Sequence, residues 1–200
     1  HRPQHEAMCK ERVAELRNEI LFRQPESSHL GDCPICFLPL SIDTDMSMLQ
    51  SCCSKTICRG CVVANIVCQR DKRQDPTCPF CRKLLPNTEE EANKNVMKRV
   101  AANDPAALSG MGRQYSKDGD YDVAFRYWTK AAEMGDVNAH YHLSLLYQEG
   151  KGVEEDEEKE LYHLEEAAIG GHPFARYNLA IKEGDNKKFD RAVKHWIIAA

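Results

Sequence analysis

The chain has 200 residues, of which 42% are hydrophobic and 29% are charged, a balance typical of a soluble globular protein. This length allows one ordinary domain or two small ones. No apolar run approaches the roughly 18 residues that a membrane-spanning helix requires, and the net charge of −4 argues against generic binding to nucleic acid or to an anionic membrane. We therefore expect no nucleic-acid partner and no membrane partner.

The chain begins without an initiator Met and without a basic stretch followed by an apolar core, so its start does not resemble a signal peptide. It ends with WIIAA, inside an expected helix, and we interpret the sequence as a fragment. Ten cysteines, eight of them clustered, are typical of metal sites in a reducing compartment. The expected location is therefore intracellular, either cytoplasmic or nuclear.

Residues 1–30 are expected to form an amphipathic helix and a linker. Val13, Leu16 and Ile20 recur at helical spacing with charged residues between them, which predicts a helix over residues 6–22. We expect this helix to pack on the domain that follows.

Residues 31–86 contain the cysteine cluster. Three CxxC pairs and one Cys-Cys doublet supply eight thiols, namely Cys33, Cys36, Cys52, Cys53, Cys58, Cys61, Cys78 and Cys81. Eight thiolates suffice for two zinc ions per chain with four sulfur ligands each. A disulfide network is the weaker alternative, because a secreted scaffold would scatter its cysteines. The residues alone leave open which pairs share an ion and which zinc fold they build.

The order and spacing of these ligands resemble the RING finger: CxxC, a long loop, two adjacent ligands, CxxC, a helix-containing stretch and CPxC. The resemblance implies interleaved ligands, with Cys33, Cys36, Cys58 and Cys61 on the first zinc and Cys52, Cys53, Cys78 and Cys81 on the second. Aligning Cys53 with the third ligand of the commonest RING pattern places Lys55 at its His position. Because an ammonium group cannot bind zinc, the resemblance implies an all-cysteine variant in which Cys52 supplies the donor.

The same resemblance implies a ubiquitin ligase. Ile35 and Pro79 match the positions that RING ligases press against a ubiquitin-conjugating enzyme, and Ile66 is expected to reach the same enzyme. Arg82 matches the linchpin cation that holds the enzyme and its thioester-linked ubiquitin closed, without acting as a nucleophile. The plainer alternative is that Ile35 and Pro79 only shape metal loops and that Arg82 is a solvated charge.

Other zinc modules fit this segment less well. A PHD finger usually requires a His ligand and an aromatic residue before its last pair, and a FYVE domain carries a basic His-rich motif. Neither feature is present. A nucleic-acid finger would need a basic face, whereas residues 31–86 hold seven basic and five acidic residues, a net +2.

Residues 87–103 are expected to form a connecting helix. Thr88 and Glu91 form a capping box at its start, and the helix should end before Asn103 because Asp104 and Pro105 follow.

Residues 104–200 repeat a pattern whose period is typical of stacked helical hairpins. Ala107, Ala139 and Ala175 occupy equivalent positions, separated by 32 and then 36 residues. Trp128 and Trp196 share a second equivalent position. Small residues at the Ala positions would let paired helices approach closely. Five histidines lie on the expected repeat helices without a metal spacing, and we expect surface or packing roles for them: His140, His142, His163, His172 and His195.

This block resembles Sel-1-like repeats, a branch of the tetratricopeptide superfamily, with about three copies of which the last is truncated. The resemblance rests on the A-x3-L-x3-Y first helix, the GxGV-x2-D turn and the W-x2-AA second helix. It implies a protein-binding scaffold that recruits a protein substrate. The expected fold is a small zinc-stabilised α+β RING finger followed by an all-α solenoid of helical hairpins. The expected activity is that of a RING-type E3 ubiquitin transferase, and the alternative is a non-catalytic zinc-binding protein-protein adaptor.

Overall fold

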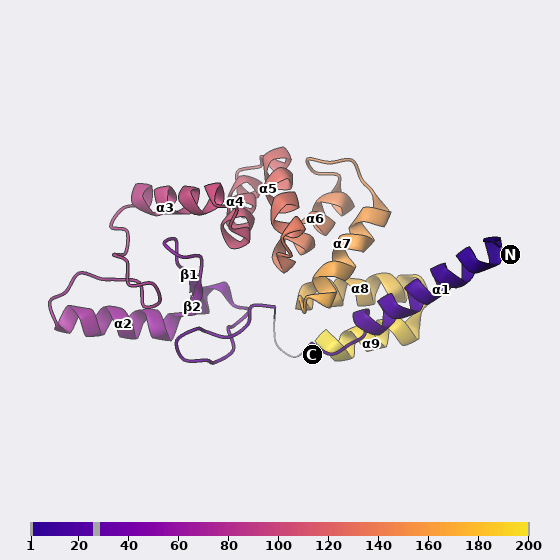
Figure 1. The fold of residues 1–200 in the computed structure, drawn as a ribbon, viewed down its shortest axis with the longest axis horizontal. Coiled ribbons are helices and arrows are strands. Elements are labelled where there is room, and N and C mark those ends of the chain that lie inside the picture. Colours follow the sequence, from indigo (N-terminus) through magenta and orange to yellow (C-terminus); the bar gives the residue numbers. More distant parts are fainter. Residues whose placement is uncertain (1, 26–28, 200) are drawn as a thin grey trace.

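The computed structural model describes residues 2–25 and 29–199, so residues 26–28 of the expected linker lie outside the described residues. Helices α3 to α9 follow one another along an arc, with the cysteine-rich segment at one end and α1 at the other (Figure 1). No helix of this described part is long and apolar enough to cross a membrane. The elements are α1 (Arg2–Leu21), η1 (Thr44–Met46), β1 (Ser47–Leu49), β2 (Thr56–Cys58), α2 (Arg59–Asp71), α3 (Glu89–Ala101), α4 (Pro105–Lys117), α5 (Tyr121–Glu133), α6 (Val137–Glu149), α7 (Glu157–Ile169), α8 (Pro173–Asp185) and α9 (Phe189–Ala199).

Helices α4 to α9 form three successive antiparallel hairpins, which confirms the predicted helical solenoid. A side-chain oxygen or nitrogen caps the first helix of each hairpin, from Asp104, Asp136 and His172 in turn. These caps are separated by the same 32 and 36 residues as the repeat positions. Ala107, Ala139 and Ala175 are all buried, so the small residues lie where the helices pack closely.

Trp128 on α5 is the largest fully buried side chain of the first hairpin. Its ring stacks on His142 of α6 with 4.4 Å between centroids, and its Nε1 donates to the carbonyl of Ser109 at 3.2 Å. Trp196 takes the equivalent position on α9 and is 47% exposed. The burial of Trp128 includes its contact with α6 of the following repeat.

Helix α1 packs on the last two hairpins and not on the cysteine-rich segment that follows it in the chain. Val13, Leu16 and Ile20, the stripe that the periodicity picked out, are exposed, whereas Leu21 is buried among side chains of α7 and α8. The buried guanidinium of Arg176 donates to the carbonyl of Leu21. The expectation that this helix packs on the cysteine-rich segment is therefore wrong, because Leu21 in its last turn is buried against α7 and α8.

Polar contacts fix α1 further. The guanidinium of Arg17 donates to Glu165 at 2.6 Å and to Glu166 at 3.1 Å, and Arg191 donates to Asn18 at 2.7 Å. These pairs join the beginning of the chain to its last two hairpins.

The cysteine-rich segment, residues 31–86, is built on a two-stranded antiparallel sheet and one helix. Strands β1 and β2 pair with Met48 opposite Ile57, and α2 starts directly after β2. Beyond its cysteines, the buried apolar side chains of this segment among the described residues are those of Leu40, Ile57 and Val62. So small a core needs another source of stability.

Arg99 on α3 connects the cysteine-rich segment to the solenoid. Its Nε donates to the hydroxyl of Ser54 at 3.3 Å, and its Nη2 donates to Asp104, the N-cap of α4. Thr88 caps α3 as predicted, accepting from the backbone N–H of Glu91 at 3.2 Å, while the Glu91 carboxylate accepts from the backbone N–H of Asn87 at 3.0 Å and so completes the cap one residue before the predicted position.

Two glycines on α4 differ in their surroundings. A Cβ built on Gly112 would lie 2.5 Å from Trp128 Nε1, whereas a Cβ on Gly110 meets nothing within 4 Å. We expect Gly112→Ala to lower the free energy of unfolding by about 1–3 kcal/mol through overpacking. Gly110→Ala, the matched control, should be neutral or raise it by up to about 1 kcal/mol through helix propensity. Urea denaturation of both variants checks this, and equal losses would contradict it.

His172 is 5% exposed and caps α8, its Nδ1 accepting from the backbone N–H of Ala175 at 3.3 Å. Burial, and then the neighbouring His29 and His142, lower the pKa of His172 to about 3. The unfolded chain therefore binds a proton near pH 6.5 that the folded chain does not bind until about pH 3. The stability that the neutral imidazole contributes is present above pH 6.5 and is lost as the pH falls toward 3.

We expect the free energy of unfolding to fall by about 1.4 kcal/mol per pH unit from this group below pH 6.5. In His172→Asn the amide can still cap the helix but does not titrate. Urea denaturation at pH 7 and pH 5 should show a loss about 2 kcal/mol smaller in the variant than in the wild type. Identical losses in the two proteins would refute the assignment to His172.

Candidate metal centres

The structure gathers the eight clustered thiols into two quartets. Cys33, Cys36, Cys58 and Cys61 form the first quartet, and Cys52, Cys53, Cys78 and Cys81 form the second. The four sulfur atoms of each quartet lie within 4.8 Å of one another. The quartets alternate along the chain in the order that the RING resemblance implies, so each quartet joins an early loop to a later one.

The sulfur–sulfur distances suit a tetrahedral metal ion. The Sγ atoms are separated by 3.7 Å for Cys36 and Cys58, by 3.9 Å for Cys53 and Cys78, and by 3.4 Å for Cys52 and Cys81. A tetrahedron of thiolates at a zinc–sulfur distance of about 2.3 Å has edges of about 3.8 Å. A disulfide would need about 2.05 Å. Each quartet could therefore hold one metal ion.

The first and last CxxC pairs adopt the same turn. The backbone N–H of Phe37 donates to the carbonyl of Cys33, and that of Arg82 donates to the carbonyl of Cys78, both at 2.9 Å. Phe37 and Arg82 are left-handed, with φ of 58° and 61°, a conformation uncommon outside glycine. The sequence gives no hint of this, because neither position is Gly, Asn or Asp.

A third turn of the same kind surrounds the Cys-Cys doublet. The backbone N–H of Ser54 donates to the carbonyl of Gln50 at 2.8 Å, and Ser54 is left-handed with φ of 54°. Gln50, which is 5% exposed, takes the place that Cys33 has in the first turn. The ammonium of Lys55 lies 5.8 Å from the centroid of the Phe80 ring. Lys55 is thus not one of the metal-binding side chains.

The remaining pair of the first quartet lies at the start of a helix. Cys58 is the N-cap of α2, and its Sγ accepts from the backbone N–H of Cys61 at 3.4 Å. Positive charge accumulates at a helix N-terminus and favours thiolates there. The helix thus positions two of the four sulfurs of this quartet.

Without a cation, the thiols of one quartet oppose one another's ionisation. Burial opposes ionisation of Cys33, but backbone hydrogen bonds from Cys36, Cys58 and Ile35 outweigh it and lower the pKa of that thiol to about 6. Burial and the neighbouring thiols raise the pKa of Cys61 to about 12, and the same causes raise that of Cys52. Four thiolates in so small a volume need a divalent cation, so the donor set fits a soft metal ion.

Two polar residues on α2 support the second quartet, and the sequence analysis missed them. Gln69 accepts from the backbone N–H of Thr77 at 2.7 Å, and the Asn65 amide donates to the Thr77 carbonyl at 2.7 Å. Thr77 directly precedes Cys78. Asn65 and Gln69 are four residues apart on a predicted helix and so lie on the same face of it. This spacing is the sequence feature that could have identified them as a pair.

The residues assigned to an enzyme partner lie on three segments of this domain. Ile35 is in the first turn, Pro79 is in the last turn, and Ile66 is in the middle of α2. Ile35 and Ile66 are each 38% exposed. Arg82 is exposed and makes no ion pair with any side chain in the described part of the chain. Cys68 is exposed and belongs to neither quartet.

The solenoid matches a known repeat family. Residues 105–136, 137–172 and 173–200 each match the Sel1 repeat. These boundaries coincide with the α4–α5, α6–α7 and α8–α9 hairpins. Residues 105–200 are therefore an array of Sel1 repeats, which supports a protein–protein interaction scaffold.

Individual proteins share this likeness over short regions. DAP3-binding cell death enhancer 1 of Rattus norvegicus is 33% identical over 67 residues, 34% of this chain and 13% of that protein. HcpC of Helicobacter pylori strain 26695, which is named as a candidate beta-lactamase, is 34% identical over 55 residues, 28% of this chain and 19% of that protein. The chain thus spans no more than about a fifth of the length of these curated relatives.

A solved structure of a Sel1 repeat protein from Oxalobacter formigenes shares the fold. Its TM-score is 0.52, and the match covers 57% of this chain and 50% of that chain. The identity is 24%, so the likeness concerns the fold alone.

Proposed function

We propose that the chain is a zinc-stabilised protein–protein adaptor in which a RING-type finger, residues 31–86, is joined to a Sel1 repeat array. The observation that carries the proposal is the pair of interleaved thiol quartets, each with sulfur spacings suited to one tetrahedral ion. Zinc is the metal of choice for four thiolates, and it supplies structural stability without redox chemistry. The repeats supply the extended surface on which a partner protein binds.

The small core of the finger supports a structural role for the metal. Leu40, Ile57 and Val62 are its buried apolar side chains apart from the cysteines, within the described residues. Domains of this size are usually stabilised by a metal or by disulfides. Each ion would join two loops that are distant in sequence, because the quartets alternate along the chain.

We expect two zinc ions per chain by elemental analysis. Cys33→Ala should lower the count and disorder the finger, whereas Cys68→Ala, an exposed thiol outside both quartets, should leave two ions. Chelation should melt α2 but leave the Sel1 helices folded, so far-ultraviolet circular dichroism should fall only in part. Fewer than one zinc in well-folded protein would refute the metal assignment.

A ubiquitin ligase is the second candidate, and the exposed apolar side chains of the finger favour it. Ile35, Ile66 and Leu84 are 38%, 38% and 64% exposed although they lie beside the metal turns and on α2. A binding surface requires such side chains to form one contiguous exposed patch. In this candidate function the surface formed by Ile35, Pro79 and Ile66 binds a ubiquitin-conjugating enzyme, and the repeats bind the protein substrate.

Such a ligase would act by positioning and not by covalent chemistry. The finger would hold the conjugating enzyme, and Arg82 would donate several hydrogen bonds at once to the enzyme and its thioester-linked ubiquitin. Restricting that flexible conjugate accelerates attack by an incoming amine, because orientation is established before the reaction. The exposed guanidinium of Arg82 is available for this role.

We expect Ile35→Ala to abolish binding of the conjugating enzyme and to keep both zinc ions, since Ile35 is not a ligand. Arg82→Ala should preserve binding but slow ubiquitin discharge roughly ten- to a hundredfold, because a charge-assisted hydrogen-bond set contributes about 1.5–3 kcal/mol. Lys83→Ala, an exposed neighbouring cation, is the matched control and should discharge as the wild type does.

The measurement is single-turnover discharge with a panel of conjugating enzymes. Equal rates for the wild type and Arg82→Ala, with an enzyme that binds, would remove the role of Arg82. Absence of both binding and discharge with every enzyme of the panel would leave the adaptor function alone.

A further inference from the structure

Two hollows lie next to each other where the finger faces the first Sel1 repeat. Their volumes are about 460 Å³ and 480 Å³, and Leu49, Gly110 and Gln114 line both of them. The shared lining places the two hollows side by side, and we call the pair the junction groove. It is bounded by β1 and α3 on one side and by α4 and α6 on the other.

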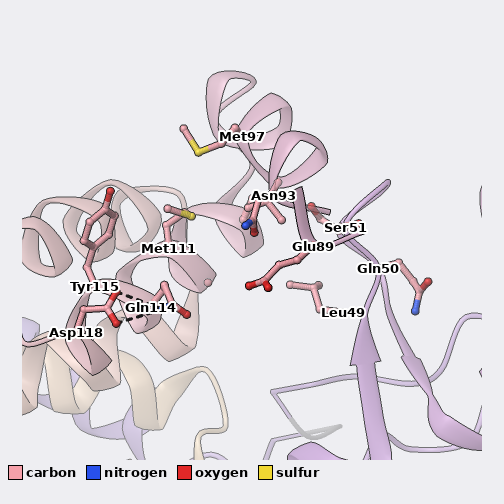
Figure 2. A pocket seen from close by; sticks show the side chains of 14 residues that line it. Leu49, Gln50, Ser51, Glu89, Asn93, Met97, Met111, Gln114, Tyr115 and Asp118 are labelled. Atoms are coloured by element: carbon pink, nitrogen blue, oxygen red, sulfur yellow. Dashed lines mark hydrogen bonds between the residues drawn. The ribbon is translucent and has the colours of Figure 1, made fainter. Parts of the chain in front are cut away.

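Apolar side chains line one part of the first hollow. Met97 of α3 and Met111 and Tyr115 of α4 border it, and Leu49 lies at its finger side (Figure 2). Leu49 and Met97 are 46% and 49% exposed. Flexible methionine side chains adapt to the shape of an apolar guest, so this hollow can receive one bulky apolar side chain.

The two carboxylates that line the first hollow, those of Asp118 and Glu89, differ in their hydrogen bonding. The Asp118 carboxylate accepts from the Gln114 amide at 3.2 and 3.4 Å, so hydrogen bonding already engages it. Glu89 lies in the first turn of α3 and extends toward the space between α3 and α4 (Figure 2). A guest would therefore avoid negative charge at the Glu89 end.

The second hollow carries the opposite charge. Arg113 and Lys117 lie one turn apart on α4, both are exposed, and neither forms an ion pair with a described side chain. The acidic residue at this hollow, Asp136, is the N-cap of α6 and accepts from the backbone N–H of Ala139 at 2.7 Å. His142 and the amide of Asn138 add polar groups to the wall.

This positive charge contrasts with the rest of the array. Residues 104–200 contain twelve Lys and Arg and eighteen Asp and Glu, a net charge of −6. Two unpaired cations in one hollow of an acidic domain favour an anionic guest. The finger side of the same hollow, with Ser41, Ser47 and Thr56, contributes hydroxyls and no charge.

We propose that the junction groove binds an extended segment of a partner protein in which a bulky apolar side chain has acidic residues on one side only. The apolar side chain occupies the hollow between α3 and α4, and the acidic residues lie over Arg113 and Lys117. Glu89 repels acidic residues at the other end, so they lie on the Arg113 side alone. This inference rests on the proposed adaptor function and names the chemistry of the partner.

Gly110 offers a way to close the groove without unfolding the protein. It lies in the middle of α4, lines both hollows, and a Cβ on it would meet nothing within 4 Å. Gly110→Leu should therefore fill the groove and favour the helix. Gly184→Leu on α8 is the matched control, since Gly184 is also helical with open space around its Cβ and lines neither hollow.

A second pair of variants tests the charge. Arg113→Glu/Lys117→Glu reverses both cations of the groove. Arg126→Glu/Lys130→Glu is the control, because these two exposed cations have the same one-turn spacing on α5 and lie outside the groove. Both double variants change the net charge equally.

The experiment selects a random peptide library on the full zinc-loaded chain and counterselects it on Gly110→Leu. Enriched peptides should combine a large apolar residue with an acidic run on one side of it. Their affinity, measured by fluorescence anisotropy, should fall at least about tenfold in Gly110→Leu and in Arg113→Glu/Lys117→Glu. Affinity in the two control variants should stay within about twofold of the wild type.

Three results would overturn the proposal: no enrichment over Gly110→Leu, enrichment of basic or uncharged peptides, or equal affinity for the charge-reversed groove. Zinc content is measured on the same samples. If the protein holds two zinc ions but selects no peptide, the groove proposal is refuted and the zinc adaptor function remains. If the folded protein holds no zinc, the adaptor function itself is contradicted.

Discussion

Convergence of sulfur atoms from distant loops determines the structure of the finger. Each quartet takes two cysteines from an early part of the segment and two from a later part, so the loops are held at both ends. Helix α2 starts directly after one of these cysteines, and its last turn contacts the segment that leads to another, through Gln69 and Thr77. The helix and the turns thus have fixed positions although few apolar side chains are buried between them.

The quartets also determine how the finger joins the repeats. The turn around the Cys-Cys doublet places the Ser54 hydroxyl against Arg99, and Arg99 contacts the N-cap of α4. The junction groove lies directly beside this contact, since Ser54 and Gln50 line its first hollow. The turn that holds Cys52 and Cys53 therefore forms part of the wall of this hollow.

The elements that sequence reasoning predicted well are those determined by local residues. The repeat interval and the capping residue Thr88 depend on spacing along the chain, and the grouping of the cysteines follows the ligand order that the RING resemblance implied. The failures concern packing at long range. Helical spacing singled out Val13, Leu16 and Ile20, yet these side chains are exposed and Leu21 is the buried one. The guanidinium of Arg176 donates to the Leu21 carbonyl and so holds this end of the helix against α8. Gln50 could not be recognised as a turn residue, because only the fold aligns it with Cys33 and Cys78.

The attachment of α1 has a consequence for the order of folding during synthesis. Leu21 and Arg176 are 155 positions apart in sequence, and Asn18 and Arg191 are 173 apart. At a translation rate of about 5–20 residues per second, the ribosome needs roughly 10–30 s to make the chain between such partners. During that interval the finger and the first repeats can fold while Leu21 stays uncovered. Helix α1 thus precedes its native neighbours by most of the repeat array, so a nascent chain exposes the Leu21 end of this helix to chaperones until α7 and α8 are made.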